Sequence, residues 1–286
     1  MKVFIISDIG AKGESVIPYG LNLGKHNEVE VEILHIIDPR SHKGVSSPYS
    51  DSQSITPGAK MTHDEIKGRD RKVVEKELDK LLSAEASRLN YPLKVNSTVE
   101  TDSVETKLKM IFADKTGAVC VASADPENSM VTELSELVSI FGKLEVPLLI
   151  VPPGYAWREP AEISLYTDFS ESSPESIKAG LKWFDAFPLT ARAFCVVPEA
   201  GVEDMKASVE SWEKTAGNIV PQSMVLRTDV VTGKPDSGAI LGQSRKSAAG
   251  LVMVPKAIFV ATEYKLKKNS ERMKFVNELG MPVLIY

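Results

Sequence analysis

The sequence has few of the residues that support covalent or metal-centred chemistry. It contains 2 cysteines and 4 histidines among 286 residues. Cys120 and Cys195 each lie within an apolar, β-like run, and neither has a second cysteine or a histidine at metal-ligand spacing. The histidines all lie in the first half, without the order of a Ser-His-Asp triad. We therefore predict buried free thiols, no metal site and no catalytic residues.

Long apolar runs and a strong net charge are also missing. No apolar run approaches the roughly 18–20 residues that span a bilayer, and the one at residues 3–6 is too short for a signal peptide. A formal charge of −5 argues against nucleic acid and anionic membranes, which attract basic surfaces. With 43% hydrophobic and 26% charged residues, we expect a cytoplasmic globular protein with no nucleic-acid or membrane partner.

Short apolar runs alternate with amphipathic segments along the first half of the chain. Strands are expected at 2–7, 30–37, 93–99, 118–122 and 146–151, and helices at 13–24, 66–89, 104–115 and 131–144. A Ser-, Pro- and Gly-rich stretch at 41–62 lacks periodicity and predicts a long loop. This alternation is typical of an α/β fold with a parallel sheet and helices on both faces.

The second half repeats this order after a break rich in proline. Strands are expected at 162–167, 193–197, 224–231, 251–254 and 282–286, and helices at 174–187, 201–217, 236–247 and 264–279. We predict a domain at 1–152 with the long loop 41–62, a linker at 153–160 and a second domain at 161–286. Each domain is expected to hold an open five-stranded parallel sheet.

An aspartate follows the first predicted strand of each half, as Ser7-Asp8 and as Thr167-Asp168-Phe169-Ser170. Ligands of open α/β sheets bind at the carboxyl ends of the strands, so these residues are candidate binding residues. The alternative is that each carboxylate caps a helix or fixes a turn. In that role it would contribute about 1 kcal/mol to the stability of the fold. Lys256 follows the predicted strand 251–254 and could pair with a phosphate, or simply be solvated.

The segment Thr167-Asp168-Phe169-Ser170, with the amphipathic helix that follows it, resembles the opening of the universal stress protein family. The segments Val146-Pro147-Leu148-Leu149-Ile150 and Met281-Pro282-Val283-Leu284-Ile285 resemble the family's last strand. The likeness covers nearly the whole chain as two tandem copies. It implies two doubly wound domains of the adenine-nucleotide-hydrolase-like kind.

The resemblance also provides a test for ATP. Family members that bind ATP carry a loop Gly-x2-Gly-x9-Gly-Ser/Thr after the fourth strand, where glycines let backbone N–H groups approach phosphate. In this sequence Ser135 and Ser270 occupy the hydroxyl places, but no glycine lies between Gly117 and Gly142 or between Gly250 and Gly280. The usual ATP loop is lost, so no cofactor is expected, with ATP as the alternative.

The resemblance implies a non-enzymatic stress-response protein that binds a ligand or a partner. The alternative is a nucleotide-binding protein that uses Asp8 or Asp168 with an atypical loop and has weak ATPase activity. A different enzyme on the same scaffold is a third reading. Because the family's last strand forms dimers, the closing strands 146–151 and 282–286 are expected to pair within the chain as an internal pseudo-dimer. A homodimer is a further expectation.

Overall fold

The chain forms two compact units, Met1–Val146 and Pro147–Tyr286, and each is described by itself. The computed structural model describes residues 1–7, 9, 16–37, 63–113, 117–124, 134–170, 173–234, 237–246, 249–256 and 278–286. The first domain predicted from the sequence ends at residue 152 and so includes the strand Leu148–Val151. In the structure this strand belongs to the second unit. Residues 153–160 contain neither helix nor strand, and Trp157 lies against Phe187 with ring centroids 6.1 Å apart.

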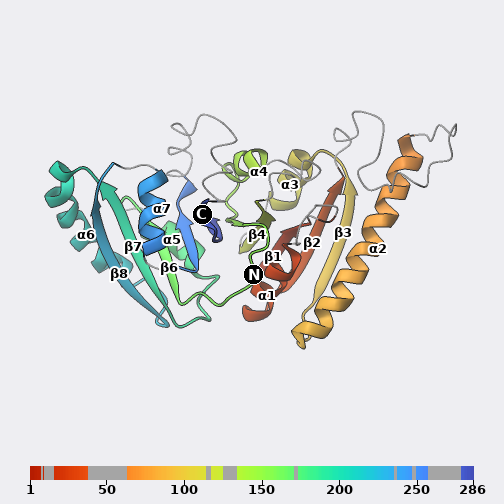
Figure 1. The fold of residues 1–286 in the computed structure, drawn as a ribbon, viewed down its shortest axis with the longest axis horizontal. Helices are drawn as coiled ribbons and strands as arrows, with labels where there is room; N and C mark the ends of the chain where they lie inside the picture. The colour runs from red at the N-terminus through yellow and green to blue at the C-terminus, as the bar shows by residue number, and fades with distance from the viewer. Residues whose placement is uncertain are drawn as a thin grey trace. The chain divides into compact units, whose positions relative to one another are not determined.

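The first unit contains a parallel sheet in the order β3-β2-β1-β4 (Figure 1). The strands are β1 (Lys2–Ile6), β2 (Glu30–Ile37), β3 (Val95–Thr101) and β4 (Ala118–Ser123). Residues Val3 to Ile6 of β1 are at most 3% exposed, as expected for a central strand covered on both faces. The continuous apolar runs of the sequence therefore mark the inner strands correctly.

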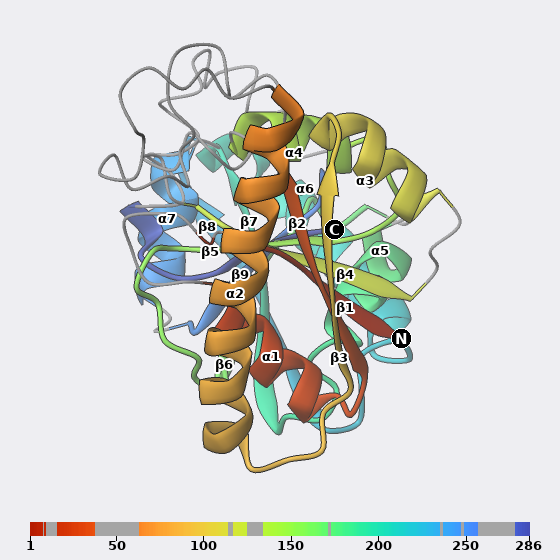
Figure 2. The same ribbon diagram turned by 90° about the vertical axis from the view of Figure 1, so that its right-hand side faces the viewer.

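The described part of the first unit contains the helices α1 (Ile17–His26), α2 (His63–Leu89), α3 (Val104–Phe112) and α4 (Leu134–Phe141). α1 packs on β1 and β2, α2 packs on β2 and β3, and α3 contacts α4 (Figure 2). Pro18 stands in the first turn of α1, where a missing N–H costs nothing and its fixed φ suits the helix.

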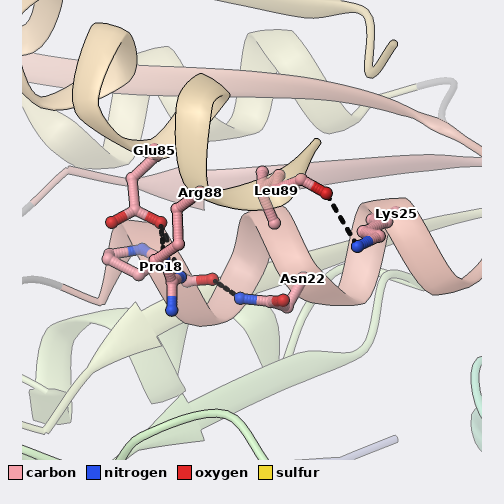
Figure 3. Close-up of polar contacts among 6 residues, drawn as sticks. All are labelled: Pro18, Asn22, Lys25, Glu85, Arg88 and Leu89. Carbon is pink, nitrogen blue, oxygen red and sulfur yellow. Dashed lines mark hydrogen bonds and ion pairs between the residues drawn. The ribbon is translucent and has the colours of Figure 1, made fainter. Parts of the chain in front are cut away.

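A polar contact joins α1 to the end of α2 (Figure 3). The Lys25 ammonium donates to the backbone oxygen of Leu89 at 2.9 Å, and Arg88 pairs with Glu85 one turn earlier. The last carbonyls of a helix have no helical partner and carry partial negative charge. Lys25 therefore stabilises the C-terminus of α2 while it fixes that end against α1.

The second unit contains a sheet in the order β5-β10-β9-β6-β7-β8. β5 runs antiparallel to β10, with Leu149 opposite Leu284, and the other pairs are parallel. The strands are β5 (Leu148–Val151), β6 (Glu162–Tyr166), β7 (Leu189–Val197), β8 (Met224–Thr232), β9 (Leu251–Val254) and β10 (Val283–Ile285). The mostly parallel α/β architecture expected from the sequence is confirmed.

Helices of the second unit with both ends in the described residues include α5 (Ser173–Leu181), η2 (Glu199–Gly201), α6 (Val202–Ala216) and α7 (Ser237–Lys246). α5 is shorter than the expected 174–187, because the chain turns after Leu181 through short-range bonds such as that from the Phe184 amide to Leu181. Phe184 and Phe187 are nonetheless buried, so they extend the apolar pattern beyond the helix. The helix expected at 264–279 lies almost wholly outside the described residues.

The two units repeat each other residue by residue around their first two strands. The Ser7 amide donates to the Leu34 oxygen at 2.8 Å, and the Thr167 amide donates to the Phe194 oxygen at 3.0 Å. Each residue of the second contact lies 160 positions after its counterpart (167 − 7 and 194 − 34). A shift of 160 therefore relates structurally equivalent residues in this part of the fold.

Candidate functional site

The turn after β6 contains four of the candidate binding residues, Thr167 to Ser170. Thr167 is fully buried, and its hydroxyl oxygen accepts a hydrogen bond from the Phe169 amide at 3.2 Å. The exposed Asp168 accepts from the Ser170 amide through Oδ1 at 3.0 Å. Hydroxyl and carboxylate side chains commonly fix turns in this way. The Asp168 carboxylate thus stabilises its own turn.

Phe169 holds an unusual place in this turn. Its φ of 53° lies in the left-handed region, which is costly for a residue with a bulky side chain. The side chain is only 3% exposed, and its ring meets Trp212 of α6 edge to face, with centroids 5.0 Å apart. Burial of both rings compensates for the backbone strain. The turn is therefore held from two sides, by its own hydrogen bonds and by aromatic packing.

Three buried titratable side chains lie close enough to Asp168 to sense its negative charge. Burial raises the pKa of the Cys195 thiol to about 11, and the charge of Asp168 adds to this effect. Burial likewise raises the pKa of Tyr166 and, more strongly, that of Tyr286. All three groups stay neutral near pH 7. They lack the thiolate or phenolate form that a nucleophile requires.

Tyr286 fills space at the end of β10. Its side chain is buried, and among the described residues its hydroxyl has no hydrogen-bond partner. The ring packs on α5, where a Cβ at Gly180 would lie 3.5 Å from Tyr286 Cγ. The main chain of Tyr286 accepts from the Lys256 amide at 2.7 Å. Lys256 follows β9 and is half-buried, and this hydrogen bond places it beside the end of β10.

The equivalent turn of the first unit has a different buried group. Ser7 is 1% exposed, and its hydroxyl oxygen accepts from the Ile9 amide at 3.3 Å. Nδ1 of His35 lies 3.1 Å from the same hydroxyl, and His35 is itself 1% exposed. Burial lowers the pKa of His35 to about 4. A neutral imidazole and a hydroxyl therefore form the buried polar pair at the end of β1 and β2.

The structure joins Thr167, Asp168, Phe169 and Ser170 in one turn and places Ser7 in its counterpart. Asp8 and Ser270 lie outside the described residues, and Ser135 is described only through its backbone in the first turn of α4. Sequence reasoning missed Trp212, Tyr286 and the pairing of His35 with Ser7. The one available signal was Trp212, a lone large aromatic residue in a helix otherwise rich in charge.

A groove of about 470 Å³ lies beside the turn that follows β6. Its volume lies in the range of small-molecule sites. None of the described residues that line it is charged, and they combine hydroxyls with two aromatic rings: Phe169, Ser170, Pro174, Ser208, Ser211, Trp212 and Thr215. The position next to a strand end is the usual one for ligands of open α/β sheets.

Two further properties bear on the class of site. Within the described residues, no group of three or more His, Cys, Asp or Glu side chains is arranged to hold a metal ion. In the same part of the chain, no helix combines the length and apolar character needed to cross a membrane.

Comparison with known proteins places the fold. No protein-family model and no curated protein sequence matches the chain. A universal stress protein from Archaeoglobus fulgidus DSM 4304 has a similar structure, with a TM-score of 0.63 and 12% identity over 99% of this chain and 97% of that one. A functionally unknown protein from Pseudomonas aeruginosa PAO1 gives a TM-score of 0.53 and 10% identity over 99% and 91% of the two chains.

These similarities extend over both units. The chain therefore has the universal stress protein fold in tandem, and the resemblance drawn from its sequence is confirmed at the level of the fold. A similarity at 12% identity shows a shared architecture and does not show a shared ligand or activity.

Proposed function

We propose that this chain is a tandem universal stress protein of the cytoplasm that binds a ligand or partner without catalysis and does not hold ATP in the family's usual way. The observation that carries the proposal is the turn after β6. Its Asp168 carboxylate accepts the Ser170 amide, and Phe169 is buried against Trp212. A nucleoside approaching Asp168 would have to compete with that hydrogen bond. The missing glycines remove the usual phosphate loop from the sequence.

The pairing of the two closing strands supports a second part of the proposal. β5 closes the first sequence repeat and β10 closes the second, and they form an antiparallel ladder from Leu148–Ile285 to Ile150–Val283. The ladder removes two apolar strand edges that would otherwise invite association with other chains. We propose that it makes the chain its own dimer, an internal pseudo-dimer of the two repeats.

Thermal unfolding in the presence of nucleotides tests the main proposal. With millimolar ATP, ADP, AMP or a cyclic nucleotide, we expect no change in Tm. A ligand at 100 times its Kd adds about 2.7 kcal/mol of stability, which shifts the Tm of a domain of this size by several degrees. A rise of that size would contradict the proposal. Asp168→Ala and Asp8→Ala would then show which half binds.

A nucleotide-binding protein with weak ATPase activity is the second candidate. It is favoured by the exposed Asp168 at the carboxyl end of β6 and by Lys256 just after β9, where phosphate would need a cation. Phosphate release from ATP that is lost in Asp168→Ala would establish this candidate. If no phosphate is released from ATP and ATP leaves the Tm unchanged, the second candidate is excluded and the non-enzymatic binding protein stands.

A further inference from the structure

The outer strand of the second unit, β8, has one open edge (Figure 1). Within the described residues it pairs only with β7, in parallel. The Gly233 amide donates to the Val197 oxygen, so the odd-numbered residues of β8 direct their backbone groups to β7. The even-numbered residues, from Met224 to Thr232, therefore direct theirs to the open edge. An open edge of this kind is a template for another strand.

The two faces of β8 differ in character. The Thr228 hydroxyl bonds to Glu213 of α6, so the even-numbered side chains face that helix. Strand alternation then places the odd-numbered side chains on the opposite face. Val225 is 58% exposed there, and Arg227 is exposed beside it. Asp229, the next odd residue, is half-buried. The edge thus carries an arginine and an aspartate two positions apart on one face.

The charges on this face are incompletely paired. Arg192 of β7 donates to Glu162 at 3.0 Å and to Asp229 at 2.8 Å. Arg227 makes no ion pair within the described residues, and it lies directly across the ladder from Arg192. Like charges opposite each other in a sheet repel. Arg227 is therefore a cation at an open edge, next to a network that ends on a carboxylate.

We propose that β8 pairs antiparallel with β8 of a second copy of this chain, about a twofold axis at Thr228. In this register Arg227 of each copy stands opposite Asp229 of the other. Leu226 stands opposite Val230, and the exposed Val225 opposite Val231. The even-numbered pairs exchange the backbone hydrogen bonds. The odd-numbered pairs are of the non-hydrogen-bonded kind, in which side chains come closest.

The charges select this register among those that the backbone permits. Because even-numbered residues must face even-numbered residues, the axis passes through a residue and not between two. An axis at Arg227 would set the two arginines against each other, and an axis at Asp229 would do the same with the aspartates. Only the axis at Thr228 brings opposite charges together twice. A self-complementary patch is what a twofold interface requires.

The first unit provides a natural comparison for this edge. Val99 of β3 pairs with His35, and Val230 of β8 pairs with Cys195. Since His35 and Cys195 are equivalent (195 − 35 = 160), Asn96 and Thr98 occupy the places of Arg227 and Asp229. The corresponding edge of β3 is neutral at both positions. It therefore lacks the charge pair that would select a partner strand.

Charge reversal tests the proposal on the full chain by sedimentation over a range of concentrations. Arg227→Asp and Asp229→Arg each place like charges opposite one another at both contacts, and we expect each to raise the dimer Kd about tenfold or more. In an equimolar mixture, the two carboxylates of the first variant stand opposite the two guanidinium groups of the second. We expect the mixture to associate about as tightly as the unaltered chain.

The mixture also separates a lost contact from a misfolded variant, because a misfolded chain would not regain association. Asn96→Asp, a matched change on the β3 edge, should leave the Kd unchanged. The proposal is overturned if the unaltered chain is monomeric at every concentration, if mixing restores nothing, or if Asn96→Asp weakens association as much as Arg227→Asp.

Discussion

The strands β1 and β6, one in each unit, are followed by a hydroxyl residue that makes the same hydrogen bond, but the buried group beside it differs. Ser7 and Thr167 each accept the amide two residues ahead through a hydroxyl. The buried neighbour from the second strand is His35 in the first unit and Cys195 in the second. Both units thus have a hydroxyl in the turn, whereas the buried group beside it differs.

An ion pair near the start of the sheet shows the same divergence. Lys2 binds Glu32 in the first unit, and Glu162 binds Arg192 in the second. The positions correspond through the shift of 160, but the signs are exchanged. Each pair is diagonal across two parallel strands, since Phe4 lies opposite Glu32 and Ser164 opposite Arg192. Both units have an ion pair at this place, but the cation lies on the first strand of the two (β1) in one unit and on the second strand of the two (β7) in the other.

The largest expected difference between the two turns is in their response to acid. His35 is neutral when folded, with a pKa of about 4, and its unfolded pKa is near 6.5. The unfolded chain therefore binds more protons between these values, so stability is full above pH 6.5 and falls as pH drops toward 4. We expect this group to remove up to about 3 kcal/mol from the free energy of unfolding. Urea unfolding from pH 7 to pH 4 measures the loss.

His35→Cys, which copies the second unit, is the matched variant for this experiment. Its free energy of unfolding should depend less on pH than that of the unaltered chain over the same window, whatever its stability at pH 7. Cys195→His should add a dependence of the same sign. Parallel pH profiles for all three chains would show that His35 titrates normally and would contradict the assigned pKa.

A second comparison concerns the glycines at equivalent places in α1 and α5, Gly20 and Gly180 (180 − 20 = 160). A Cβ at Gly20 would lie 2.5 Å from Cδ1 and Cγ1 of Ile5, whereas one at Gly180 would lie 2.3 Å from Cε of Met253. The methionine tip can swing away, but Ile5 is stiff near its branch. We expect Gly20→Ala to cost about 1–3 kcal/mol and Gly180→Ala about 1 kcal/mol or less.

Gly68 of α2 provides the control, because nothing lies within 4 Å of a Cβ placed there. Gly68→Ala should stabilise the chain by up to about 1 kcal/mol through helix propensity alone. Thermal and urea unfolding of the three variants would give the ranking. Equal losses for Gly20→Ala and Gly180→Ala would show that the flexibility of the neighbour does not matter.

Local patterns in the sequence predicted much of this fold. The strands 30–37 and 251–254 have the bounds found in β2 and β9, because apolar runs set them locally. The sequence also identified the turn Thr167–Ser170 as a special feature. The end of α5 was wrong, since Phe184 and Phe187 continue an apolar pattern that serves the core from a turn.

The buried contacts around the turns could not be predicted, because they join residues distant in the chain. Ser7 and His35 meet only because β1 and β2 pair in one particular register. Trp212 contacts Phe169 from α6, which follows β7 along the chain. The local sequence predicts that His35 lies in a strand. Whether its side chain is exposed or buried depends on residues that are distant in the chain.

The smallest expected effect tests whether the fold requires the polarity of the ion pair. Lys2→Glu should cost about 1 kcal/mol, because it sets two carboxylates together at a half-buried place. The double variant Lys2→Glu, Glu32→Arg transfers the pair of the second unit into the first and should recover most of that loss. A double-mutant cycle by urea unfolding measures the coupling between the two positions.

The second unit sets the limit of this exchange. There Arg192 also binds Asp229, so the reverse transfer, Glu162→Lys with Arg192→Glu, breaks a second contact and sets the introduced carboxylate near that of Asp229. We therefore expect recovery in the first unit and an incomplete recovery in the second, with both couplings reduced at high salt. Equal recovery in both units would mean that the contact between Arg192 and Asp229 adds nothing to stability.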